Sequence, residues 1–578
     1  MPSERRFHVI AEGKTAYRIR VQPNASEPEL FAAEELQKYL RQMTGVEVPV
    51  SARSRGSKTI HVGVVSGDDS PLRNAGDDGF IIRTRKEALV LAGASPRGAL
   101  YAVYAFLEEV LGCAWLKPGD EFVPETNDLS VPALDRLEIP DFTTRMLVHF
   151  PCPAPATRNQ IDWMAKRRFN ESFLATNNDL SAWENGAMCD RVVPDLRRRG
   201  LKARMPGHAF TAWLPPARYA GRHPEYYALI GGERRPEASL CLSNSDAAKE
   251  VAANIGAFAD QHPFVKQITL WHNDHNAGCE CARCREWEDR TETSVALDPS
   301  GKTSRFVRTV SQTGAEMRFV NRVAEILERT HPEVTVETLA YLSNYAPSRR
   351  VVPRKNVCVG FALFDRLLRP ELAGEPVFSR GSRLRPMADY LRQWRAQTER
   401  LYLYEYFGFF HDFAPLWDVM RADFQSYLRY GICQIGSEIG TRNDLHMYFL
   451  SRLSWSSRTS VDNILRDYCR ASYGPAAGTM EEFWQVLRRA HLPWNYGLIA
   501  ARRAGVTPGG WDAGRRSEAR WARAERRCME QLDSAVRKLR GSPLLPRGTT
   551  AQSDPRALDR VRQLRSAWAE PVIPWWAT

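Results

Sequence analysis

Apolar residues recur with two different spacings along the chain, and the way these spacings alternate changes near residue 142. Before that point, helical spacing predicts two amphipathic helices, over 29–43 and 96–111. Thr44 and Gly45 are typical of the residues that end such a helix. Short apolar runs predict strands at 16–21, 59–65, 79–84 and 88–92. Residues 1–138 are therefore predicted to form a small α/β domain.

From residue 142 to 460 the pattern repeats as strand, loop and helix. Helical segments are predicted over 314–329, 386–397 and 445–453. Eight strands are predicted, at 144–150, 172–176, 202–208, 267–274, 335–342, 357–365, 401–406 and 432–439. Eight strands that alternate with helices predict a (β/α)8 TIM-type barrel over 142–460. Long insertions follow its third strand (210–265) and its fourth (275–313), and long loops in a compact domain are usually functional.

The remaining residues, 461–578, are mainly helical in pattern. Helices are predicted over 462–472, 480–490 and 517–539, and the tail carries Trp568, Trp575 and Trp576 near prolines. We expect this region to be a helical C-terminal domain that packs on the barrel.

Composition narrows the class of protein. A chain of 578 residues with 43% hydrophobic residues can bury a large core, and no apolar run reaches the length of about 18 residues that a membrane span needs. Residues 1–20 lack a signal-peptide pattern, so we expect a cytoplasmic protein, or a secreted one if a leader has been removed. The sequence leaves the oligomeric state open.

The formal net charge of +12 raises nucleic-acid binding as a hypothesis. Much of the excess lies in 515–540, where Arg alternates with Glu and Asp at helical spacing. That arrangement is typical of a solvated helix face, so we expect no nucleic-acid partner. A nucleic-acid binder would instead show a contiguous basic face and a steep salt dependence.

Carboxylates at the predicted strand ends are the candidates for chemistry. Barrel enzymes place their active sites at the C-terminal ends of the strands, and glycoside cleavage uses two such groups. Asp274 on strand four, Glu405 on strand seven and Glu438 on strand eight are our catalytic candidates. Aromatic neighbours of Glu405 would raise its pKa by burial and suit it to acid–base work. For each acid the alternative is a structural carboxylate in a salt bridge.

Aromatic and polar residues near the same ends predict a sugar-binding surface. Aromatic rings can stack on the apolar faces of pyranose sugars while a few polar groups fix orientation. The candidate substrate-binding residues are His208, Trp213, Trp271, Asn273, Tyr341, Asp365, Tyr404 and Tyr406. The alternative for the aromatic residues is core packing, and for Tyr404 the two readings are equally good.

Three cysteines, Cys279, Cys281 and Cys284, lie close together just after strand four. Three thiolates and a fourth ligand, either Cys241 or His275, would make a structural zinc site. The alternatives are a disulfide, or free thiols that hold a loop. We expect catalysis itself to need no cofactor.

Two regions of the chain, the N-terminal domain and the barrel, resemble known families. The segments AAEELQKYLRQMTGVEVPV (32–50) and LVLAGASPRGALYAVYAFLEEVLGCAWLKPGDEFVP (89–124) resemble the N-terminal domain of bacterial α-glucuronidases and β-hexosaminidases, which implies a mostly structural domain packed on a catalytic barrel. The segments HPEYYALIGGERRP (223–236), SLCLSN (239–244), HNDHNAGCECARC (272–284) and YGICQIGSEIG (430–440) resemble bacterial proteins of domain of unknown function 4838, some of which form glycoside hydrolase family 163. That group's usual Asn-Asp-Gly reads Asn273-Asp274-His275 here.

The resemblance implies a barrel hydrolase that acts on a 2-acetamido sugar or a uronic acid, similar to a β-N-acetylglucosaminidase. We therefore expect a glycoside hydrolase with a carbohydrate substrate. The alternative is a non-catalytic, carbohydrate-binding barrel, because a fold does not by itself imply chemistry.

Overall fold

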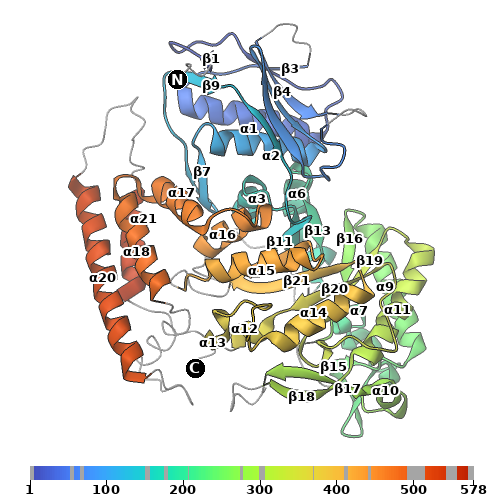
Figure 1. Ribbon diagram of the computed structural model, residues 1–578. Coiled ribbons are helices and arrows are strands. Elements are labelled where there is room, and N and C mark those ends of the chain that lie inside the picture. Colours follow the sequence, from blue (N-terminus) through green and yellow to red (C-terminus); the bar gives the residue numbers. More distant parts are fainter. Residues whose placement is uncertain are drawn as a thin grey trace.

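The computed structural model describes residues 6–52, 58–65, 71–149, 157–174, 180–205, 207–273, 278–297, 306–368, 370–408, 414–439, 444–490, 514–541 and 556–569. An N-terminal α/β region packs on one side of a closed barrel, and long helices from the C-terminal region lie beside it (Figure 1).

The N-terminal region is built on a six-stranded mixed sheet. Its strands follow the order β10 (Asp135–Glu138), β5 (Phe80–Arg85), β6 (Ala88–Gly93), β4 (Thr59–Val64), β2 (Arg18–Arg20) and β3 (Val50–Ser51). Two further antiparallel pairs of short strands belong to this region: β1 (Arg6–Ile10) with β9 (Leu129–Pro132), and the hairpin of β7 (Ala114–Lys117) with β8 (Asp120–Phe122). The predicted strands of this region are confirmed.

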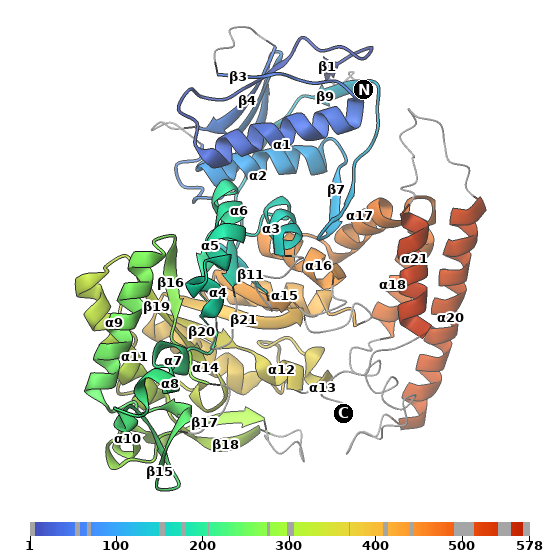
Figure 2. The ribbon, with the colours of Figure 1, turned by 180° about the vertical axis from the view of Figure 1, so that it is seen from behind.

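Two helices, α1 (Glu27–Thr44) and α2 (Pro96–Glu109), pack against each other and against this sheet, as predicted (Figure 2). Ser26 and Glu29 form a capping box at the start of α1, and the Ser95 hydroxyl accepts a hydrogen bond from the Gly98 amide at the start of α2. Gly45, at φ +74°, ends α1 in the left-handed conformation that glycine favours.

The barrel contains the eight predicted strands in chain order, each parallel to its neighbours. They are β11 (Thr144–His149), β12 (Glu171–Leu174), β13 (Lys202–Arg204), β16 (Val265–Thr269), β19 (Thr335–Ala340), β20 (Val357–Ala362), β21 (Leu401–Gly408) and β22 (Gln434–Ile439). Strands three and four are shorter than predicted within the described residues. Beyond them the two chain segments stay paired through an isolated bridge between His208 and Trp271.

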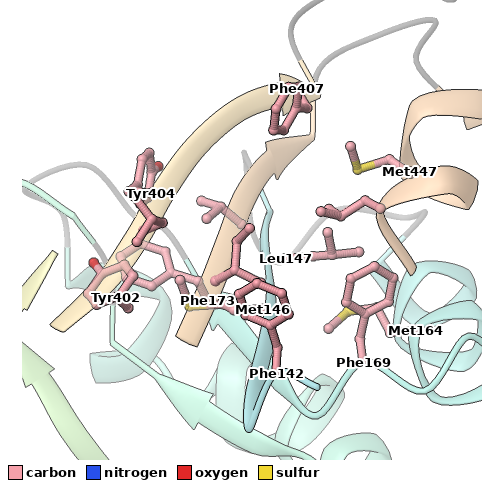
Figure 3. Close-up of a cluster of buried hydrophobic side chains, with 14 of the residues drawn as sticks. Phe142, Met146, Leu147, Met164, Phe169, Phe173, Tyr402, Tyr404, Phe407 and Met447 are labelled. Carbon is pink, nitrogen blue, oxygen red and sulfur yellow. The ribbon is translucent and has the colours of Figure 1, made fainter. Parts of the chain in front are cut away.

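Helices surround the barrel. They are α3 (Thr157–Lys166), α4 (Ser181–Glu184), α5 (Ala187–Arg191), α6 (Val193–Arg198), α9 (Ser245–Gln261), α11 (Thr313–Thr330), α12 (Phe364–Leu368), α13 (Pro370–Ala373), α14 (Arg385–Gln397), α15 (Trp417–Arg429) and α16 (Asp444–Trp455). Buried side chains such as Phe142, Leu147, Met164 and Met447 fill the space between the strands and this layer (Figure 3).

One layer of side chains inside the barrel is polar rather than apolar. Arg204 pairs with the Glu171 carboxylate and, at 2.8 Å, with that of Glu337. Tyr402 and Gln267 also donate hydrogen bonds to Glu337. Burial raises the pKa of Glu337, whereas Arg204 opposes that shift. These side chains satisfy one another's charges and hydrogen bonds, so the layer is a self-contained polar network in the barrel interior.

The two predicted insertions contain structure of their own. The first holds α7 (Phe210–Trp213), α8 (Pro216–Tyr219), η1 (Pro224–Tyr226) and the hairpin β14 (Tyr227–Ile230) with β15 (Glu233–Leu240), before α9. The second holds α10 (Ala282–Trp287) and the hairpin β17 (Asp289–Leu297) with β18 (Phe306–Ser311), before α11; a short turn, η2 (Leu342–Asn344), follows β19.

The C-terminal region is helical, as predicted. It comprises α17 (Val461–Tyr473), η3 (Gly474–Ala476), α18 (Ala477–Arg489), α20 (Gly514–Gly541) and α21 (Ala557–Ala569), the last of which was not predicted. Trp568 on α21 is buried against Phe483, while Trp575 and Trp576 lie outside the described residues. Among the helices that the structure describes, none is both long enough and apolar enough to span a membrane.

Candidate active site

Six side-chain rings contact one another in a closed circuit at the C-terminal ends of the barrel strands. We call this set the mouth ring. Successive centroid separations are 5.4 Å (Trp271–Tyr404), 5.3 Å (Tyr404–Tyr406), 5.4 Å (Tyr406–Phe364), 5.4 Å (Phe364–Tyr341), 6.4 Å (Tyr341–His208) and 5.9 Å (His208–Trp271). Five strands or their following loops contribute these residues, so the mouth ring encircles the end of the barrel where such folds carry their sites.

Strand alternation determines which side chains reach the mouth ring. Tyr402, Tyr404 and Tyr406 on β21 point to one side: Tyr402 joins the polar layer, and the other two join the mouth ring above it. Leu403, Glu405 and Phe407 point to the opposite side, where Phe407 contacts Phe424 on α15.

Glu438 on β22 is the predicted acid that lies against the mouth ring. The Tyr404 hydroxyl donates a hydrogen bond to the Glu438 Oε1. Burial, and then the Glu438 carboxylate, raise the pKa of Tyr404 well above its usual value, so the phenol keeps its proton. Glu438 is half-buried, and a substrate could therefore approach its carboxylate while Tyr404 holds it in place.

A histidine–carboxylate pair that the sequence did not predict lies beside the mouth ring. The His272 Nδ1 is 3.0 Å from Oε2 of Glu316, on the first turn of α11. Thr338 and Asn344 donate hydrogen bonds to the same carboxylate, at 2.7 and 2.5 Å. The His272 ring also stacks on Tyr341 at an interplanar angle of 23°. Glu316 therefore fixes the orientation of an imidazole at the end of strand four.

His208, a predicted binding residue, is a member of the mouth ring. Its Nδ1 lies 2.5 Å from the carbonyl oxygen of His272, and because a carbonyl only accepts, this nitrogen must carry a proton. The contact joins the ends of strands three and four, next to the bridge between His208 and Trp271.

Two further predicted binding residues are buried and hold chain segments next to the mouth ring. Asn273 is buried, and its Nδ2 donates a 2.8 Å hydrogen bond to the carbonyl oxygen of Ala238 on β15. Asp365, on the first turn of α12, is buried beside Tyr345. Burial, and then the Asp365 carboxylate, raise the pKa of Tyr345 well above its usual value.

Two predicted site residues lie away from the mouth ring. The fully buried Glu405 faces α15, where it accepts a 2.6 Å hydrogen bond from Tyr427 and lies 3.5 Å from Arg366. Burial raises its pKa to about 7. Trp213 packs on Phe258 of α9 and donates a hydrogen bond to the carbonyl oxygen of Thr269. Both side chains therefore join the barrel to its helices.

Asp274, the predicted acid of strand four, lies outside the described residues, as does His275. The chain on either side of them is described. Asn273 is held by β15, and Cys279 accepts a hydrogen bond at its Sγ from the amide of Leu229 on β14.

The structure brings together the four cysteines that were singled out. The Sγ atoms of Cys241, Cys279, Cys281 and Cys284 all lie within 4.8 Å of one another. This cluster lies at the base of the β14–β15 hairpin, and none of the four thiols lies in the mouth ring.

Fold and site together define a TIM-type barrel protein with an N-terminal α/β domain and a polar, aromatic mouth. Residues 10–106 match the model described as glycosyl hydrolase family 67 N-terminus. Residues 115–484 match the model of the domain of unknown function DUF4838, and the chain belongs to that family. No curated protein matches the chain.

Several solved structures resemble most or nearly all of the chain. A family GH115 4-O-methyl-α-glucuronidase with specificity for decorated arabinogalactans aligns with a TM-score of 0.62 at 11% identity, over 99% of this chain and 78% of that one. A GH138 enzyme targeting pectin rhamnogalacturonan II aligns with 0.57 at 11% identity, over 96% and 68%. The Streptomyces plicatus N-acetyl-β-hexosaminidase aligns with 0.51 at 16% identity, over 82% and 93%. At such identities the likeness establishes the shared fold.

Proposed function

We propose that the protein is a glycoside hydrolase whose sugar-binding site lies at the mouth ring, where His208 and Phe364 are half-buried and the other four rings are buried. One observation carries this proposal: a closed circuit of aromatic side chains at the C-terminal end of the barrel, with the Glu438 carboxylate hydrogen-bonded to one of its members. Aromatic faces bind the apolar faces of sugars, and a carboxylate beside them can act on the glycosidic bond. The glycosidases among the similar structures support this function.

The candidate residues divide into three roles. Glu438 supplies a carboxylate that Tyr404 orients. Asp274 supplies the second acid, a role that rests on its sequence position at the end of strand four. The His272–Glu316 pair either holds a proton for transfer or forms a hydrogen bond to the substrate. Glu405 has no part in this proposal because it faces α15.

The substrate class that we propose is a glycan with a 2-acetamido sugar or a uronic acid. The hexosaminidase and the glucuronidase among the similar structures support these two alternatives. With a 2-acetamido sugar, the substrate's own acetamido oxygen could attack the anomeric carbon. The protein would then need one carboxyl group to protonate the leaving oxygen and another to orient the acetamido group.

A screen on aryl glycosides of N-acetylglucosamine, N-acetylgalactosamine and glucuronic acid, together with mixed glycan pools, tests this function. The decisive comparison is between Glu438→Gln and Glu405→Gln on the substrate that the screen identifies. We expect Glu438→Gln to lower kcat by about 100-fold or more while its Tm stays within a few degrees of wild type. Glu405→Gln should retain kcat.

Asp274→Asn should also abolish turnover without loss of stability. Full activity of both Glu438→Gln and Asp274→Asn would contradict the proposed carboxylates. Tight glycan binding by the wild-type protein without any turnover would instead identify a carbohydrate-binding barrel.

A further inference from the structure

The four cysteines of the cluster come from two chain segments. Cys241 follows β15, and the other three come from the segment that leads from strand four into α10. Cys241, Cys279 and Cys284 are buried, and Cys281 is half-buried. All four are free thiols, so the fold places four sulfur ligands in one small volume without joining any two of them covalently.

Two of the six separations between the sulfur atoms match the edges of a coordination tetrahedron, and all six are at most 4.8 Å. Zinc–sulfur bonds of about 2.3 Å at tetrahedral angles put the sulfurs about 3.8 Å apart. The Sγ of Cys241 lies 3.8 Å from that of Cys281 and 3.9 Å from that of Cys284. A disulfide would need a separation of about 2.05 Å.

Groups around the sulfurs suit negatively charged thiolates. The Leu229 amide donates to the Cys279 Sγ at 3.2 Å. The Ser243 hydroxyl lies 3.4 Å from the Cys281 Sγ and 3.3 Å from the Cys284 Sγ. Arg234 also interacts with Cys241 and offsets part of the negative charge that four thiolates would leave on a divalent ion. Such outer contacts are the usual second layer of a metal site.

We propose that Cys241, Cys279, Cys281 and Cys284 bind one structural Zn²⁺ ion as four thiolates. A tetrahedral set of four sulfurs selects zinc or iron, and zinc binds such ligands more tightly than Fe²⁺. Four protein ligands leave no open position, so the ion has a structural role and takes no part in the reaction.

The ion joins the β14–β15 hairpin to the chain that follows strand four. Hydrogen bonds already link the two: the Glu280 amide donates to the Leu229 carbonyl oxygen at 2.7 Å, and Asn273 donates to Ala238. Zinc adds a covalent tie at Cys279, five residues after Asp274. The inference stands independently of the proposed glycosidase activity, because its test measures metal rather than turnover.

Elemental analysis of the full-length protein, purified without chelators, tests the proposal first. We expect one zinc per chain. After removal of the zinc with a chelator, titration with Co²⁺ should give the intense visible absorption of a tetrahedral cobalt–thiolate site, at one equivalent. Absence of stoichiometric zinc together with absence of that absorption would overturn the proposal.

Cysteine variants locate the site. Cys241→Ser and Cys284→Ser should lose the bound zinc, whereas the control variants Cys189→Ser and Cys433→Ser, outside the cluster, should retain it. If the cluster variants fail to fold, the cobalt titration of the wild-type protein still decides the question. Stoichiometric iron, or a disulfide within the cluster found by mass spectrometry without reductant, would also overturn the assignment.

Discussion

At the scale of single residues, the site depends on which face of its strand each acid occupies. Glu405 and Glu438 lie in the second half of neighbouring strands, and both are predicted from the sequence to be catalytic acids. Only Glu438 lies on the same side as Tyr404, whereas Glu405 faces Arg366 and Tyr427. These strands are covered on both sides and carry polar residues on both, so their sequence shows no alternation that reveals which positions face inward.

Tyr404→Phe tests whether the phenol positions the Glu438 carboxylate. The variant keeps the ring and its contacts with Trp271 but loses a hydrogen bond to a charged group, which is worth about 1.5–3 kcal/mol. We expect kcat/KM to fall by roughly 10- to 100-fold. The pH–rate profile should also change, because Glu438 loses its donor.

Tyr427→Phe is the matched control for this variant. It removes a comparable phenol-to-carboxylate hydrogen bond, to Glu405 at 2.6 Å, on the side of β21 that faces away from the mouth ring. We expect lower stability with unchanged kcat/KM. Equal activity losses in the two variants would contradict the proposed role of Tyr404.

At the scale of secondary-structure elements, most of the fold could be predicted from apolar spacing. The eight barrel strands and the helices α1, α2, α11, α14 and α16 follow local patterns of burial, which sequence records directly. The pairing of His272 with Glu316 joins residues 44 positions apart, so no local spacing reveals it. The short hairpins β14–β15 and β17–β18 lie in long insertions with little apolar alternation, and they were not predicted either.

The contact between β21 and α15 predicts a pH-dependent stability. Burial, and then the neighbouring Asp423, raise the pKa of Glu405 from 4.5 to about 7, although Arg366 opposes the shift. Because the folded pKa is raised, the neutral carboxyl stabilises the fold fully below pH 4.5. This contribution, at most about 3 kcal/mol, is lost as the pH rises to about 7.

Glu405→Gln cannot ionise at this position and isolates the effect. The free energy of unfolding of the wild type, minus that of the variant, should decrease between pH 4.5 and 7 and then level off. Urea unfolding at several pH values measures this difference, in which the titrations of distant groups cancel. A difference that is constant or rises with pH would contradict the prediction that the folded protein favours the neutral form of the Glu405 carboxyl group.

At the scale of the whole molecule, buried ion pairs join the N-terminal region to the barrel. Asp78, in the loop before β5, accepts 2.6 Å hydrogen bonds from Arg97 on α2, from Arg145 on β11 and from Asn170 before β12. A second contact lies at the end of α2, where Glu108 pairs with Arg167 and Arg168. Because these charges are buried and pair across the boundary between the two regions, we expect the two regions to unfold together.

Asp78→Asn tests this coupling. Burial alone would raise the pKa of Asp78, but Arg145 and Arg97 outweigh it and lower the pKa below 3.8. The contribution of Asp78 is therefore present above pH 3.8 and lost as the pH falls further. The variant leaves two buried guanidinium groups without their carboxylate, so we expect a loss of about 3–5 kcal/mol in the free energy of unfolding at neutral pH.

Asp77→Asn is the control, because Asp77 is 68% exposed and lies 3.7 Å from the same Arg97, a surface contact worth at most about 1 kcal/mol. Denaturant unfolding followed by both circular dichroism and tryptophan fluorescence should give one cooperative transition for each protein, with a lower midpoint for Asp78→Asn alone. Similar midpoints for the two variants would show that the buried network does not hold the N-terminal region to the barrel.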